Sequence, residues 1–475
     1  MPVNIFEVIK AENAGRRGRV AIVDGDRRLS YGELIASAES VAVELEKAGV
    51  CPLGRVGLVC GNSADYVVVS LAVLSVGAAL VPVSPEHATP EIAAIMAEMA
   101  ADLVVFRRSE YTAEGAVDLE PAIPLRAAFG VLHRAGNLPP APGYAEIAPA
   151  FIRFSSGTTG ASKGIVLSHR AIIERTDAAD LGLGITCDDR ILWVLSMSFH
   201  FVVTILLFLR RGAAIVLLGE PFLDRMAEGV STHGGTFVYA SPFHYALMTG
   251  SDLVPAGSLS RVRKAVSTTV KLPEDVASGF RAKYGLALTE AYGIIEVGLP
   301  FIGTRGERPG SSVGRPLPGY RVRIADPDAT GTGEICIAGP GMLDAYLSPW
   351  RTRDGILEDG WFRTGDLGSV DRDGFLTIVG RRKNVINFAG MKVFPMEVEE
   401  VINRFPGVRE SVVYGEEHAR YGTLPMAKIV CAGETFDIEG LRRFCYERLA
   451  PYKVPKGFEL VREIPKTRSG KIRRL

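Results

Sequence analysis

The sequence has few of the features that would assign a protein to a class at sight. It holds six cysteines in 475 residues, and no two lie at the short spacings of a zinc site or a disulfide framework. The 54 basic residues balance 54 acidic ones, which argues against a nucleic-acid binder with a large basic surface. The N-terminal stretch lacks the apolar core of a secretory signal. These absences favour a cytoplasmic protein with buried, reduced cysteines.

Long hydrophobic runs are also scarce. The least polar run, "YVVVSLAVLSVGAALVPV" at residues 66–83, is long enough to raise the question of a membrane span. Gly77 and Pro82 interrupt it, and proline cannot continue a helix. The run therefore predicts a core helix followed by a buried strand, and no membrane.

The chain is too long for a single hydrophobic core, so two or more domains are expected. Between residues 19 and 219, short β-branched runs alternate with helical stretches, which predicts parallel sheets covered by helices. Past residue 311, glycine and proline are spaced as in short antiparallel strands. The predicted fold is α/β: a large N-terminal domain at 1–380 with two helix-covered sheets and a β-rich subdomain at about 311–380, then a small α+β domain at 384–475.

One stretch, "FSSGTTGASKG" at residues 154–164, carries a chemical signal. Its glycines let the backbone approach a ligand, its hydroxyls can donate hydrogen bonds, and Lys163 adds a mobile positive charge. This combination suits a polyphosphate, although the spacing is not that of a P-loop. A surface loop without function is the alternative. The remaining candidate residues of the loop are Ser155, Ser156, Gly157, Thr158, Thr159 and Gly160.

The loop resembles the phosphate-binding loop of the adenylate-forming superfamily, which comprises acyl- and aryl-CoA synthetases, peptide-synthetase adenylation domains and beetle luciferases. Four further blocks match that superfamily in the same order, namely "AYGIIE" (291–296), "GWFRTGDLG" (360–368), "GRRKNVI" (380–386) and "PKTRSGK" (465–471). The resemblance covers nearly the whole chain. It implies an ATP-dependent ligase that joins a carboxylic acid to AMP, releases pyrophosphate, and passes the acyl group to a thiol.

The resemblance also implies roles for individual residues. The loop and Lys163 would hold the phosphates, Glu296 would bind Mg²⁺, and Lys471 would reach the reacting carboxylate when a mobile C-terminal domain closes. In the nucleotide site, Tyr292 and Gly293 would contact the adenine, Asp366 the ribose hydroxyls, and Arg381 the ribose or phosphate. For the thiol step, Lys383 would be the hinge and Gly390 would let the pantetheine arm of CoA pass.

The acid pocket departs from the pattern of the superfamily. Ile295 stands where threonine is usual, which removes a phosphate contact, and Ser267, Thr268 and Thr269 replace a Gly-Gly-Ala segment and would narrow the pocket. Phe199 and His200 would form the pocket wall. In the superfamily, adenylation domains that take amino acids carry an aspartate in this segment to pair with the amino group. No aspartate lies between residues 193 and 208, so amino acids are disfavoured as substrates. An aryl or a short- to medium-chain acid is expected.

Three interpretations stay open at this point. The first is an acid–CoA ligase that uses ATP, Mg²⁺ and CoA, as a monomer or homodimer. The second is an acid–AMP ligase that loads the phosphopantetheine of an acyl carrier protein. The third is a degenerate protein that binds a nucleotide or an acyl ligand without catalysis, which the altered Ile295 motivates.

Overall fold

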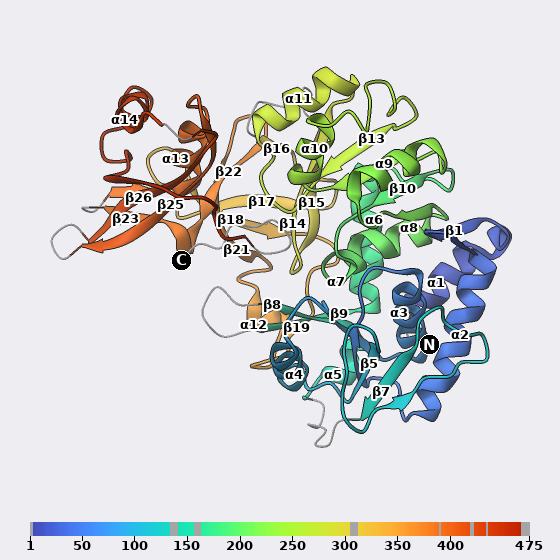
Figure 1. Cartoon of the computed structure of the whole chain (residues 1–475). Coiled ribbons are helices and arrows are strands. Elements are labelled where there is room, and N and C mark those ends of the chain that lie inside the picture. The colour runs from blue at the N-terminus through green and yellow to red at the C-terminus, as the bar shows by residue number, and fades with distance from the viewer. Residues whose placement is uncertain are drawn as a thin grey trace. The chain divides into compact units, whose positions relative to one another are not determined.

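The computed structural model describes residues 3–133, 141–155, 163–304, 312–388, 391–418, 422–433 and 436–466 (Figure 1). Contacts divide the chain into two compact units. The first contains residues 1–308, 315–321 and 338–362, and the second contains residues 309–314, 322–337 and 363–475. Strands of the β-rich stretch after residue 311 thus group with the C-terminal part of the chain. A domain boundary with a hinge at residue 383 stays a prediction.

The first sheet of the first unit has eight strands in the order β15-β14-β13-β12-β10-β11-β1-β2. Strands β1, β11, β10, β12, β13 and β14 run parallel, whereas β2 and β15 are antiparallel edges. The strands are β1 (Val20–Asp24), β2 (Arg27–Ser30), β10 (Arg190–Trp193), β11 (Ala214–Leu217), β12 (Phe237–Ala240), β13 (Lys264–Ser267), β14 (Leu288–Ile294) and β15 (Gly298–Thr304).

Helices cover this sheet because its strands are apolar on both sides. Helices α9 (Phe222–Ser231), α10 (Pro242–Thr249) and α11 (Glu274–Tyr284) bury Met226, Tyr245 and Phe280 against it (Figure 1). Helix α6 (His169–Leu183) packs on β15, and α8 (Leu206–Arg210) packs on β11. The short α7 (Met197–His200) contacts the π-helix η2 (Phe201–Ile205), which in turn contacts α6 and α8. The parallel strands therefore all end at one edge of the sheet, where ligands usually bind in open α/β folds.

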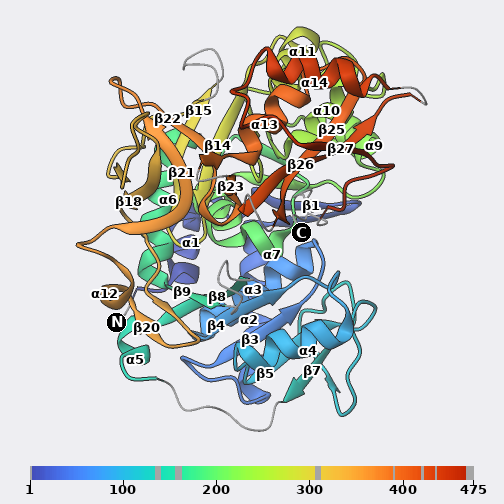
Figure 2. The ribbon, with the colours of Figure 1, turned by 90° about the vertical axis from the view of Figure 1, so that its left-hand side faces the viewer.

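The second sheet has nine strands in the order β20-β19-β9-β8-β4-β3-β5-β7-β6. Helix α4 (Thr89–Glu98) lies across it and buries Ile92 and Met96 (Figure 2). The strands are β3 (Arg55–Val59), β4 (Ala79–Val83), β5 (Leu103–Arg107), β6 (Val117–Asp118), β7 (Phe129–His133), β8 (Pro149–Ser155), β9 (Lys163–Ser168), β19 (Ala345–Tyr346) and β20 (Arg351–Thr352). Short helices α5 (Tyr144–Ile147) and α12 (Arg353–Ile356) flank it.

Three helices near the N-terminus complete the first unit: α1 (Ile5–Glu12), α2 (Tyr31–Lys47) and α3 (Ala64–Val76). A capping box at Ser30 and Glu33 begins α2, and Gly77 in the left-handed conformation ends α3. Strand β4 follows α3, so the predicted helix and buried strand at residues 66–83 are confirmed. No helix among the described residues is long and apolar enough to cross a membrane.

The second unit contains two five-stranded sheets. One has the order β16-β22-β21-β18-β17, and the other joins β24, β23, β26 and β25, with β27 beside β26. Helix α13 (Pro395–Ile402) has Pro395 in its first turn and buries Val398 and Ile402 against the second sheet, together with α14 (Ile438–Tyr446). The strands are β16 (Ser312–Gly314), β17 (Arg321–Ala325), β18 (Gly333–Ala338), β21 (Phe362–Val370), β22 (Leu376–Arg381), β23 (Ile386–Phe388), β24 (Met391–Val393), β25 (Val408–His418), β26 (Gly422–Cys431) and β27 (Gly457–Leu460).

The predicted α/β class, with a large N-terminal region of helix-covered sheets and a smaller C-terminal region, is confirmed. The expectation for the cysteines is wrong in part. All six are free, as expected, but Cys51 is exposed and Cys187 and Cys431 are half-buried. Cys51 lies in the loop between α2 and β3, where an apolar side chain finds nothing to pack against.

Candidate active site

Strands β8 and β9 form a hairpin that brackets the predicted phosphate loop (Figure 2). Ser155, at the end of β8, pairs in register with Lys163, at the start of β9. Lys163 is therefore fixed by the sheet at its backbone while its side chain stays half-buried. The predicted residues Ser156, Gly157, Thr158, Thr159, Gly160, Gly390 and Lys471, with the side chain of Ser155, lie outside the described residues.

Tyr346 links two of the predicted catalytic residues. The Lys163 ammonium lies 4.7 Å from the centre of the Tyr346 ring, a cation–π contact that fixes the charge in place. Burial raises the pKa of Tyr346, and the negative charge of Glu296 raises this pKa further. The negative charge of Glu296 thus acts on the tyrosine that Lys163 contacts. Tyr346 was missed in the sequence because its strand, β19, reaches β9 only through the fold.

The turn that carries Glu296 is held by backbone contacts. Strand β14 shifts register against β15 after Tyr292, and a side chain at Gly293 would place its Cβ 2.0 Å from the Gly298 carbonyl oxygen. Only glycine fits there. The buried Arg175 donates from Nη1 to the Ile295 carbonyl at 3.0 Å, and the Leu343 amide donates to the Glu296 carbonyl at 2.7 Å.

Aromatic rings gather at the carboxyl end of β10. Trp193 stacks on Tyr239 with 5.4 Å between ring centres and meets His200 edge to face at 6.0 Å. Phe199 and His200 both lie in α7, one turn beyond this strand. The predicted wall residues are therefore adjacent to a buried aromatic group, which would give the pocket an apolar side.

Buried polar atoms without a hydrogen-bond partner in the described structure lie at the same edge. They include Trp193 Nε1, Ser267 Oγ and Thr269 Oγ1. Thr268 differs, since its hydroxyl donates to the Ala291 carbonyl at 3.2 Å. Thr269 has φ of +84°, which strains a β-branched residue by about 1–2 kcal/mol. A strained backbone beside buried polar atoms that lack hydrogen-bond partners is typical of ligand sites.

Arg153 in β8 is a further site residue that the sequence analysis missed. Its Nη1 donates to the Phe199 carbonyl at 2.9 Å, and its guanidinium lies 4.9 Å from the centre of the Phe199 ring. Burial lowers its pKa to about 10, and the charge of Glu296 opposes that shift. The signal was available, because a single arginine interrupts the apolar run "AFIRF".

In the second unit, Asp366 and Arg381 face each other across β21 and β22. Arg381 Nε lies 2.7 Å from a carboxylate oxygen of Asp366, whose side chain is only 5% exposed. The Asp366 amide donates to Thr364 Oγ1 at 3.1 Å, which fixes the turn. The structure thus joins the two residues predicted for the ribose. Lys383 is exposed, in a short 3₁₀ turn after β22.

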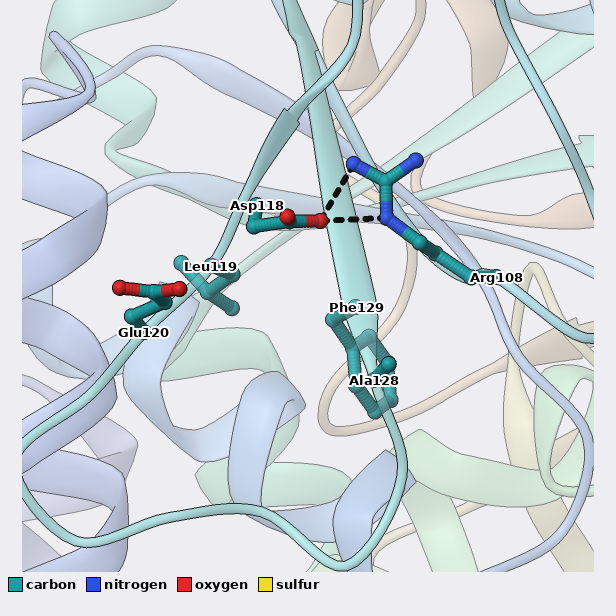
Figure 3. A pocket seen from close by; sticks show the side chains of 6 residues that line it. All are labelled: Arg108, Asp118, Leu119, Glu120, Ala128 and Phe129. Atoms are coloured by element: carbon teal, nitrogen blue, oxygen red, sulfur yellow. Dashed lines mark hydrogen bonds and ion pairs between the residues drawn. The ribbon is translucent and has the colours of Figure 1, made fainter.

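A shallow cavity elsewhere in the first unit contains none of the predicted residues. It is lined by Arg108 and Asp118, which form an ion pair, and by the backbone around Phe129 (Figure 3). Its lining residues lie in and beside β6 and β7 and just after β5, and its two opposite charges pair with each other. We therefore do not assign the predicted site to this cavity.

Family models match both parts of the chain. The AMP-binding enzyme model covers residues 9–347, and the model of the AMP-binding enzyme C-terminal domain covers residues 397–471. The chain belongs to the AMP-binding, adenylate-forming enzymes. The predicted superfamily is confirmed, and so is the class of AMP-forming acid–thiol ligases.

Curated relatives and solved structures agree with this assignment. The chain is 30% identical to 4-coumarate–CoA ligase 5 of Oryza sativa subsp. japonica, over 97% of this chain and 91% of the relative. It is 28% identical to indoleacetate–CoA ligase of Aromatoleum aromaticum, over 96% and 94%. The ATP-bound MatB of Rhodopseudomonas palustris superposes with a TM-score of 0.83 at 25% identity, covering 99% of this chain and 97% of that one.

The acidic residues of the adenylate-forming enzyme suit a cation that arrives with its nucleotide. No group of three or more His, Cys, Asp or Glu side chains that could hold a metal occurs in the described ranges. Mg²⁺ needs no such cage, because it is usually held by one or two carboxylates together with substrate phosphates. Glu296, whose side chain is half-exposed, fits that role.

Proposed function

We propose that the chain activates a carboxylic acid with ATP to form an acyl-adenylate and pyrophosphate, and then transfers the acyl group to the thiol of CoA with release of AMP. The observation that carries this proposal is the segment at residues 343–346, which contacts the Lys163 ammonium through the Tyr346 ring and the Glu296 carbonyl through the Leu343 amide. A cation and a carboxylate on either side of one segment can face the phosphates and their Mg²⁺.

In the first step, the acid's carboxylate oxygen attacks the α-phosphorus and pyrophosphate leaves. Lys163 stabilises the charge that grows on the phosphate oxygens, and the ring of Tyr346 keeps the ammonium in place. Mg²⁺, when bound with ATP, would neutralise phosphate charge at Glu296. Asp366, oriented by Arg381, accepts hydrogen bonds from the ribose hydroxyls. We assign Lys471 to the same step, and Tyr292 and Gly293 to the adenine.

In the second step, the CoA thiol attacks the acyl carbon and AMP leaves with the electrons of the broken bond. We propose that Lys383 allows the C-terminal part to reorient, since an exposed residue at the end of a strand can absorb a backbone change. Gly390 would then line the path of the thiol.

For the acid, we propose an aryl or a short- to medium-chain compound. The stacked Trp193 and Tyr239 favour a flat or apolar group, and names such as 4-coumarate–CoA and indoleacetate–CoA ligase among the relatives support an aryl acid. The unmet hydroxyls of Ser267 and Thr269 favour a polar substituent on it. Hydroxylated aryl acids satisfy both requirements.

The test is acid-dependent exchange of labelled pyrophosphate into ATP, with and without Mg²⁺, across hydroxylated aryl, plain aryl and aliphatic acids. Exchange with one class, followed by thioester on adding CoA, is the expected result. Exchange without a CoA thioester would reassign the acceptor to a carrier protein. Binding of ATP without exchange for any acid would favour the degenerate binder.

A further inference from the structure

Arg153, half-buried in the first unit, differs from the buried Arg210 in having no ion pair to a carboxylate among the described residues. Its side chain contacts Phe199 twice, through the carbonyl and through the ring. Its Nε is shielded from solvent and has no hydrogen-bond partner in the described part of the chain. No ion pair to Arg153 occurs among the described residues, although the charge of Glu296 acts on it from further away. The Arg153 guanidinium thus has a buried donor, Nε, without an acceptor in the described part of the chain.

Arg210 shows how the same unit treats an arginine that supports the fold. Its side chain is 5% exposed, and it pairs with Glu12 at 2.8 Å and with Asp177 at 2.9 Å. Its Nη1 also donates to the hydroxyl of Thr176 at 2.6 Å. Burial of a charge is costly unless it is paired and hydrogen-bonded, and Arg210 meets that requirement from within the chain.

Arg153 therefore keeps a shielded Nε donor that has no acceptor in the described part of the chain, and a ligand can supply that acceptor. The flat fork of donors matches a carboxylate with two parallel hydrogen bonds. Arg153 lies on Phe199, in the segment assigned to the acid, and within electrostatic reach of Glu296, assigned to the phosphates. An anion bound by Arg153 would thus sit where the acid meets ATP.

We propose that Arg153 binds the carboxylate of the acid and orients it for attack on ATP. This inference rests on the proposed function and adds a residue to it. Two consequences follow. The acid would bind as its anion, and the energy cost of the buried guanidinium would fall when the carboxylate arrives. An ATP phosphate is the competing oxyanion, and the experiment below separates the two.

The experiment compares Arg153→Met, Arg153→Lys and the wild type in full-length protein by pyrophosphate exchange, with the acid and ATP varied in turn. Loss of charge-assisted hydrogen bonds should raise the KM for the acid by about 10- to 100-fold in Arg153→Met and leave the KM for ATP within about twofold. Arg153→Lys keeps the positive charge but not the paired guanidinium donors, so its KM for the acid should lie between those of the wild type and Arg153→Met. Arg210→Met is the matched control, with the KM for the acid unchanged.

A second readout does not depend on turnover. With AMP present, the acid should raise the melting temperature of the wild type and of Arg210→Met, but not of Arg153→Met. A raised KM for ATP with an unchanged KM for the acid would overturn the proposal, as would unchanged kinetics with a lower melting temperature. Absence of exchange in the wild type would instead contradict the proposed function itself, so the two failures are distinguishable.

Discussion

Two regions of the first unit each bury an arginine and surround it differently. Between α1, α6 and α8, Arg210 is paired with two carboxylates. Between β8 and α7, Arg153 has a carbonyl and an aromatic face but no carboxylate among the described residues. The helical region satisfies its charge within the chain, whereas the region at the sheet edge leaves polar atoms for a ligand. Removing groups from the first should cost stability, and removing groups from the second should cost activity.

The largest expected effect lies at the sheet edge. Replacing Lys163 with methionine removes the charge that faces the phosphates and should slow pyrophosphate exchange by about 10²- to 10³-fold. Because a methionine side chain can still pack on the Tyr346 ring, the melting temperature should change little. Exchange kinetics and a thermal melt measure both. If the Lys163 variant exchanged pyrophosphate normally but lost much of its stability, the sheet edge would support the fold as the helical region does, and the contrast would be wrong.

The next effect is a pH dependence in the helical region. Burial lowers the pKa of His169 to about 4, and its Nδ1 accepts from the Ile5 amide at 3.2 Å. Its pKa in the unfolded chain is higher, so the unfolded state binds the extra proton first. This contribution to stability is complete above about pH 6.5 and is lost as the pH falls toward 4, by roughly 3 kcal/mol.

Urea unfolding of the wild type and of His169→Gln between pH 4 and pH 7.5 measures the contribution of His169 to stability as the difference between the two proteins. The free energy of unfolding of the variant should fall less steeply with acid than that of the wild type. Parallel curves would contradict the assignment of a buried, neutral His169.

Arg210 should give a smaller loss of stability. Arg210→Met removes one of two arginines that pair with Glu12 and Asp177. Arg211 stays within 3.7 Å of Glu12 and 2.9 Å of Asp177, and the two acidic side chains are 30% and 50% exposed, so part of the penalty is relieved. We expect a loss of about 2 kcal/mol in the free energy of unfolding. Arg225→Met, in an exposed pair with Glu228, is the control and should cost about 0.5 kcal/mol or less. Equal losses in both variants would mean that burial does not distinguish them.

The smallest effect concerns Ile295. A threonine there would restore the hydroxyl that the superfamily places near a phosphate, worth about 1 kcal/mol, or about a fivefold gain in kcat/KM for ATP. Ile295→Val has nearly the same shape as the threonine without the hydroxyl and is the matched control. The Arg175 contact is to the Ile295 carbonyl, so both variants keep it. Equal kinetics for the two variants would show that the hydroxyl meets no phosphate.

Features that depend on residues close together in the chain, such as the end of a helix, could be predicted from the sequence. The interruption at Gly77 predicted the end of a core helix, and α3 ends there. The resemblance assigned Asp366 and Arg381 to the same nucleotide, but their ion pair appears only in the structure. Predictions of this kind needed only a helix signal or a matching motif.

Contacts made across the fold could not be predicted in the same way. Tyr346 reaches Lys163 because β19 joins β9, although the two residues are far apart in sequence. The positive φ of Thr269 arises at the end of a strand, where no β-branched residue would be expected. Arg153 could be noticed as a charge in an apolar run, but its missing carboxylate is visible only in three dimensions.

The most direct measurement is a single turnover with excess enzyme, ATP and an acid that supports exchange, quenched before and after adding CoA. The proposed two-step reaction predicts an acyl-adenylate and pyrophosphate in the first sample, and AMP and acyl-CoA in equal amounts in the second. Release of ADP, or an adenylate that persists when CoA is added, would contradict it.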